Sequence, residues 1–213
     1  MSDDGVLTAT PANVLTVQAD SADSALGWAT LGDRRWRCVV GAGGIREDKV
    51  EGDGATPVGT FPLRRIYYRN DRLVLPRTVG LPARPISEHD GWCDDPRADA
   101  YNRLVHVPND WSHEKMWRDD GLYDLVVVVG YNDDPPEGEW GSAIFLHVAR
   151  DDMGPTRGCI AFARGDLLEL VPLITRETRL RILSHPANEA APPPSDEEEV
   201  LKEFEDFDEK EWS

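Results

Sequence analysis

The chain of 213 residues has the length of one domain of ordinary size, or of one domain with a tail. Its formal net charge is −17, and residues 195–213 hold ten acidic residues and two lysines, which is −8 of that total. Nucleic acids and anionic membranes bind cationic surfaces, so this charge argues against both as partners. No run approaches the roughly 18 apolar residues of a membrane span, and the N-terminus lacks the basic and apolar segments of a signal peptide.

The first half of the chain predicts short β-strands. Runs rich in valine and aromatic residues are bounded by Gly, Asp and Pro, a pattern typical of mainly β domains. The expected strands are 13–19, 25–31, 35–42 and 59–68. Residues 69–122 are rich in turn formers, and we expect an irregular, functional segment there, with one short helix over "HEKMWRDD" (113–120).

The second half predicts buried strands and one helix. "YDLVVVVGYN" (123–132) is nearly continuous valine, as in a strand buried on both faces, and "SAIFLHVA" (142–149) is the next strand. Asp166 and Glu169 have the spacing of a helix N-cap and its reciprocal partner, which predicts a helix over 166–171 that Pro172 ends. A last strand is expected over 179–183. The sequence thus indicates a mainly β fold with one short helix after Cys159.

The expected domain covers residues 1–186, and residues 187–213 read as a Pro-rich linker and an acidic tail. Val200, Leu201, Phe204 and Phe207 recur in this tail at helical spacing. Two interpretations stay open: a solvated tail, or an amphipathic helix that docks on the domain or on a partner.

Two motifs resemble a nucleotide-binding loop and a metal site, but each lacks residues or spacing that such a site needs. "GATPVGT" (54–60) has P-loop glycines but lacks the lysine that reaches the phosphates. Pairs of aspartates recur along the chain without EF-hand spacing, so we expect no metal site and no cofactor.

The three cysteines Cys38, Cys93 and Cys159 leave at least one free thiol, and a Cys38–Cys93 disulfide is an open alternative in an oxidising compartment.

The stretch "GPTRGCIAF" (154–162) places Cys159 directly after a glycine, and His147 ends the preceding apolar strand. If the chain loops back after that strand, the imidazole and the thiol face each other, and the histidine can activate the thiol as a nucleophile. The alternative from the residues alone is a buried structural cysteine beside a strand histidine.

The residues around this pair fit the catalytic interpretation. Arg150, Arg157 and Arg164 flank the site and are expected to favour the thiolate. Gly158 allows a close backbone approach, and its amide and that of Cys159 are candidates to bind an oxyanion.

The two halves of the chain together resemble the YkuD-type L,D-transpeptidase catalytic domain over roughly residues 13–185. That family has a Gly-Asp-x-x-Thr-Pro-x-Gly turn, a histidine at a strand end, and a Ser/Thr-x-Gly-Cys-hydrophobic signature. The matching residues are Gly52, Asp53, Thr56, Pro57 and Gly59, then His147, then Thr156, Gly158, Cys159 and Ile160. The chain departs from the pattern at Val148, Arg157, Ala161 and Phe162, all near the expected substrate cleft.

The resemblance implies a mixed β-sheet sandwich or partial barrel that cross-links peptidoglycan stem peptides without a cofactor. Cys159 would form an acyl-enzyme, His147 would transfer protons, and the product would be a 3,3-type or a 1,3-type link. Two alternatives are an L,D-carboxypeptidase or endopeptidase, and a non-catalytic scaffold that binds stem peptides. The resemblance also implies a periplasmic location.

Substrate contacts are expected from Thr156, Arg157, Arg150, Tyr101 and Asn102. "GWCDDPRADAYN" (91–102) is the candidate cleft wall, and its acids are expected to attract the acceptor amine. The alternative for this segment is a purely structural loop.

Overall fold

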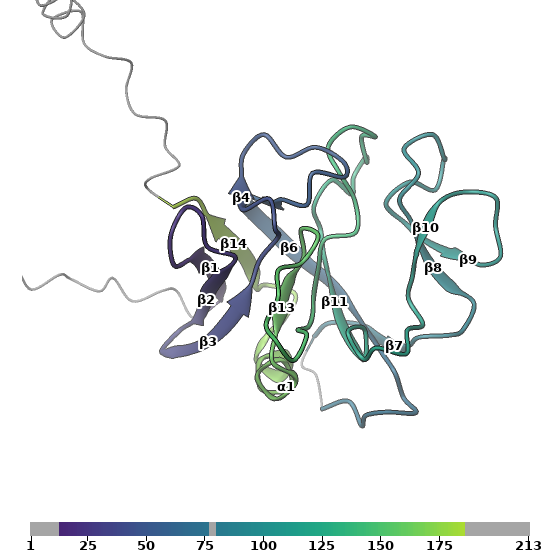
Figure 1. The fold of residues 1–213 in the computed structure, drawn as a ribbon. Coiled ribbons are helices and arrows are strands. Elements are labelled where there is room, and N and C mark those ends of the chain that lie inside the picture. Colours follow the sequence, from purple (N-terminus) through teal and green to yellow (C-terminus); the bar gives the residue numbers. More distant parts are fainter. Residues whose placement is uncertain (1–12, 77–79, 186–213) are drawn as a thin grey trace, which may run out of the picture.

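The computed structural model describes residues 13–76 and 80–185, which form a mixed β-barrel with a small separate sheet beside it (Figure 1). Within this part of the chain eight strands close into a ring, in the order β11-β12-β13-β3-β2-β1-β14-β6. Their bounds are β1 Val14–Ala19, β2 Leu26–Leu31, β3 Arg34–Val39, β6 Gly59–Tyr68, β11 Leu125–Val129, β12 Phe145–Val148, β13 Ile160–Phe162 and β14 Arg179–Leu183. The predicted mainly β fold with a short helix after Cys159 is confirmed.

The long strand β6 closes the ring. Its first half pairs with β14 and its second half pairs with β11, both antiparallel. The second half also pairs with β7 (Ala83–Pro85), which extends the sheet outside the ring. A closed ring leaves few unpaired strand edges, and it gives the functional residues a rigid support.

Two shorter pairings lie outside the barrel. β4 (Ile45–Arg46) pairs in parallel with β5 (Thr56–Pro57). β8 (Asp90–Cys93), β9 (Leu104–His106) and β10 (His113–Lys115) form a three-stranded antiparallel sheet, which we call the small sheet. Figure 1 shows the small sheet to one side of the barrel.

The apolar residues form two main clusters on opposite faces of β11. Leu125, Val127 and Val129 belong to the barrel core, whereas Val126 and Val128 belong to a second cluster, which also contains Trp92 and Met116 from the small-sheet region. β11 is therefore buried on both faces, as its run of valines predicted.

The helix α1 (Arg164–Leu170) begins two residues earlier than expected and continues into a 3-10 turn, Val171–Leu173. Ala163 is the N-cap residue and no side chain caps the helix, so the predicted capping by Asp166 is wrong. Glu169 instead forms an ion pair with Arg34, 2.8 Å long. α1 buries Leu167 and Leu170 in the barrel core.

Three other predictions have definite outcomes. The helix expected over 113–120 is wrong, because His113–Lys115 pair with Cys93–Gly91 as β10. The three cysteines are all free, so the Cys38–Cys93 alternative is wrong as well. The strands over 13–19, 25–31, 59–68 and 179–183 are confirmed within a residue at each end.

The acidic tail and its proposed helix lie outside the described residues, and the domain boundary at residue 186 stays a prediction. None of the helices in the described part of the chain has the length and apolar character needed to cross a membrane.

Candidate active site

The parallel pairing of β12 with β13 brings Cys159 and His147 together. Parallel neighbours need a crossover connection, and here the chain from Ala149 to Cys159 provides it. His147 pairs with Ala161, so Cys159, two residues before Ala161, has its side chain on the same face as His147. Both residues are more than nine-tenths buried and both line a cavity of ≈ 420 Å³.

Gly158 allows the tight approach that the cysteine loop makes to the chain around Ala55. Its φ is +123°, a conformation that favours glycine, and a Cβ there would lie 2.7 Å from the Ala55 carbonyl oxygen. The amide of Gly158 donates a hydrogen bond to Thr156 Oγ1 at 3.1 Å. In this structure that amide is therefore occupied, which leaves the amide of Cys159 as the remaining oxyanion candidate.

Thr56 joins the two sequence motifs in space. Its buried hydroxyl accepts a hydrogen bond from the amide of Gly41 (2.8 Å) and donates one to the carbonyl of Gly158 (2.9 Å). The Gly-Asp turn before it is closed by the Asp53 carboxylate, which accepts hydrogen bonds from the amides of Val50 and Ala55. The first motif thus fixes the loop that carries Cys159.

His147 is a neutral base at neutral pH. Burial lowers its pKa to about 4. Its Nδ1 lies 2.8 Å from the carbonyl oxygen of Val148. A carbonyl only accepts hydrogen bonds, so Nδ1 carries the proton and Nε2 holds the free lone pair.

Cys159 rests as a neutral thiol. Burial raises its pKa to about 12, and a hydrogen bond from the Phe145 backbone opposes this rise without cancelling it. The sulfur donates to the carbonyl of Ala143 at 3.2 Å. The expected thiolate is therefore not the resting form, because desolvation outweighs any effect of the flanking arginines.

Arg150 and Arg157 line the cavity and are exposed. Neither guanidinium forms a hydrogen bond or ion pair with the described residues, whereas the cavity cations Lys49 and Arg118 are paired with Asp53 and Glu114. The two arginines are thus available for an anionic group of a ligand. Arg164 lies elsewhere: it pairs with Asp124 and donates to the carbonyl of Arg72.

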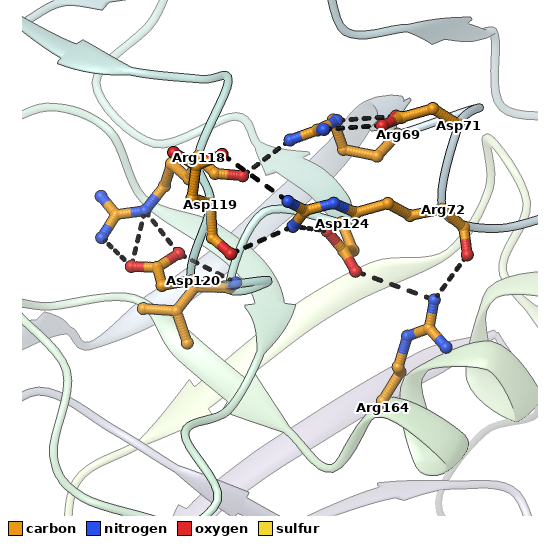
Figure 2. A network of polar contacts seen from close by, with 9 residues as sticks. Arg69, Asp71, Arg72, Arg118, Asp119, Asp120, Asp124 and Arg164 are labelled. Atoms are coloured by element: carbon orange, nitrogen blue, oxygen red, sulfur yellow. Dashed lines mark hydrogen bonds and ion pairs between the residues drawn. The ribbon is translucent and has the colours of Figure 1, made fainter.

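A polar network holds the loop that forms one wall of the cavity (Figure 2). Arg69 makes a bidentate ion pair with Asp71 and donates to the carbonyl of Arg118 at 2.6 Å. Arg72 and Arg164 both contact Asp124 in the same network. The network fixes the chain on both sides of Tyr123.

Tyr123 is the aromatic residue that covers the histidine. Its ring packs edge-on against His147, with the centroids 5.4 Å apart, and against Phe145 at 5.9 Å. The guanidinium of Arg118 lies 5.0 Å from the centroid of the Tyr123 ring. Its positive charge contributes to the lowered pKa of His147. Burial among these side chains accounts for most of the lowered pKa of the imidazole.

Three residues expected to contact substrate are engaged within the protein. Thr156 Oγ1 lines the cavity but donates to the carbonyl of Cys159 at 2.7 Å, which shapes the loop. Tyr101 lies outside the cavity and donates to Glu51, which does line it. Asn102 lines a second cavity, and its amide bonds to Trp92, Ala143, Tyr131 and Asn132.

The sequence interpretation missed several cavity residues that come from distant segments. They are Lys49, Glu51, Glu114, Arg118, Tyr123 and Ser142. They carry no local signal, because long-range pairings bring them together. Asp94, from the segment expected to form the cleft wall, also lines the cavity. Within residues 13–76 and 80–185, no three His, Cys, Asp or Glu side chains are grouped as metal ligands would be.

A family model for the YkuD L,D-transpeptidase catalytic domain matches residues 16–182, and the chain therefore belongs to this family. No curated protein and no solved structure was found to match the chain. Family membership implies that the protein is a cysteine enzyme with L,D-transpeptidase-type activity, and that its substrates belong to peptidoglycan.

Proposed function

We propose that the protein is a peptidoglycan L,D-transpeptidase that uses Cys159 as nucleophile and His147 as the proton carrier. The observation that carries this proposal is that the neutral imidazole of His147 on β12 and the thiol of Cys159, directly before the parallel strand β13, line one cavity. The proposal includes a periplasmic location, which rests on the family.

In the first half-reaction the Cys159 sulfur attacks the carbonyl carbon of an L-configured centre in the donor stem. The thiol proton passes to His147 Nε2, so the neutral pair becomes charged only as the new C–S bond forms. We assign the oxyanion to the amide of Cys159. His147 then gives the proton to the amine of the departing D-residue, and a thioester remains.

In the second half-reaction an amine of a second stem attacks the thioester. The C–S bond breaks, a new amide bond forms, and the amine proton returns to the sulfur by way of His147. Arg150 and Arg157 are proposed to bind the carboxylate of the departing D-residue, because they are the cavity cations with no partner in the described chain. No metal or organic cofactor takes part in these steps.

The test is incubation with purified muropeptides and analysis of the products by mass spectrometry, beside a Cys159→Ala variant. The expected result is a dimer that depends on Cys159, with fragmentation showing a 3,3-type or a 1,3-type link. Trimmed monomers would assign a carboxypeptidase or endopeptidase instead. Unchanged muropeptides that still bind to the folded protein would favour the stem-peptide scaffold.

A further inference from the structure

Two buried side-chain polar atoms in the described chain have no hydrogen-bond partner, and both line the cavity of Cys159. They are Asp94 Oδ1 and Ser142 Oγ. Ser142 lies near the Tyr101 hydroxyl and contributes to the pKa of that tyrosine, but the two groups are not in hydrogen-bond geometry. An unpaired buried polar group is costly, so each of these two atoms is a candidate to bind a ligand atom in the cavity.

The hydrogen-bonding capacity of the two oxygen atoms determines which chemical group of a ligand they can bind. A carboxylate oxygen only accepts hydrogen bonds, and a hydroxyl oxygen accepts as well as donates. The other cavity carboxylates are occupied, since Glu51 accepts from Tyr101 and Glu114 from Arg118. Asp94 has no ion pair within the described residues, so it is the cavity anion available to a cationic N–H donor.

The position of the pair favours a group that reacts at the sulfur. Ser142 precedes Ala143, whose carbonyl accepts the hydrogen bond from the Cys159 thiol at 3.2 Å. Asp94 follows directly after β8, so the small sheet supplies the charge. An amine held here lies in the same cavity as the thioester that it must attack.

We propose that Asp94 and Ser142 bind the amine of the acceptor stem peptide, and this rests on the transpeptidase function proposed above. The bound ammonium releases one proton to solvent, and the amine nitrogen then attacks the thioester carbon. The second proton passes through His147 to the departing sulfur, so the thiol is restored and an amide is formed.

The experiment measures the two half-reactions separately in the full chain. Intact mass spectrometry follows acylation by a donor stem, and a stem peptide that carries the acceptor amine but no cleavable donor bond is supplied as acceptor at limiting concentration. The ratio of cross-linked to hydrolysed product is compared for wild type, Asp94→Asn, Ser142→Ala and the control Asp99→Asn. Asp99 is an exposed residue on the same segment and does not line the cavity.

The expected result is a ratio about tenfold lower for Asp94→Asn, the effect of one charge-assisted hydrogen bond. Ser142→Ala lowers the ratio less, Asp99→Asn leaves it unchanged, and all variants acylate at the wild-type rate. An unchanged ratio in Asp94→Asn overturns the proposal, and so does an equal loss of acylation, which would place both atoms on the donor. A wild-type protein that is not acylated at all would reject the transpeptidase function itself.

Discussion

The barrel and the small-sheet region are held together by different forces. The barrel strands bury a continuous apolar core, whereas most ion pairs of the described chain involve residues 69–124. His147 stands on a barrel strand and Cys159 directly precedes its parallel neighbour. Residues 69–124, which we call the polar region, supply five of the residues that line the cavity, namely Asp94, Glu114, Arg118, Leu122 and Tyr123. The apolar barrel thus gives Cys159 and His147 a rigid support, whereas ion pairs hold the segment that forms one wall of the cavity.

The largest expected effect is on the acylation rate, which is compared between a variant of the barrel and a variant of the small sheet. His147→Gln removes the general base that we propose on the barrel, and we expect acylation by a donor stem to slow roughly 10²- to 10⁴-fold. The same change at His106, an exposed residue of the small sheet, serves as the control and is expected to leave the rate unchanged. Acylation kinetics by intact mass spectrometry measure both variants, and equal effects at the two positions would contradict the assignment.

The stability of the barrel is expected to depend on pH through His147. Its pKa is about 4 when folded and 6.5 in the reference state, so the unfolded chain binds more protons between these values. The contribution of His147 to the free energy of unfolding is fully present above pH 6.5. It falls by about 3 kcal/mol as the pH drops towards 4. Urea unfolding at a series of pH values measures this, and His147→Gln should flatten the curve in that window.

The link between the two barrel motifs is expected to be a local source of stability. Thr56→Val keeps the shape of the side chain but leaves the Gly41 amide and the Gly158 carbonyl without their partner. We expect a loss of about 2 kcal/mol in the free energy of unfolding. Thr56→Ser retains the hydroxyl and is the matched control. If the Val variant were as stable as the Ser variant, the two hydrogen bonds of Thr56 would not contribute to the free energy of unfolding.

The smallest effects are expected at two ion pairs, one in the polar region and one on the barrel. Arg69→Ala removes a guanidinium that is buried beside Asp71 and stacked 3.5 Å from the Trp117 ring, and we expect a loss of about 1 kcal/mol. Arg34→Ala breaks the exposed pair with Glu169 and should cost about 0.5 kcal/mol or less. Hydrogen exchange should localise the first effect to residues near 117–124, and a global effect would contradict the separation of the regions.

Most of the barrel could be predicted from the sequence because its strands carry their own signals, but the three-residue strand β13 was not among the expected strands. The valine run of β11 and the alternation in β1 are local patterns, and they correspond to real burial. Cys159 and His147 were candidates because residue type and chain position were compatible with a nucleophile and its base, and the family resemblance selected this interpretation over a structural cysteine. The strand bounds there follow from the turns, which glycine and proline mark.

The polar region could not be predicted, because its strands are three or four residues long and form only through long-range pairing. The helix expected at 113–120 failed for this reason, since the partner strand of β10 lies about twenty residues earlier. The resting protonation of the catalytic pair also had no sequence signal. Burial sets it, and burial is a property of the folded chain.

The most direct test of the central claim is to trap the acyl-enzyme. The protein is mixed with a donor stem peptide in the absence of acceptor, quenched in acid, and examined by intact mass and peptide mapping. The account predicts an adduct with the mass of the donor less its D-residue, located on Cys159 and formed far more slowly by His147→Gln. An adduct on another residue, or its absence while the donor is still consumed, would contradict the account.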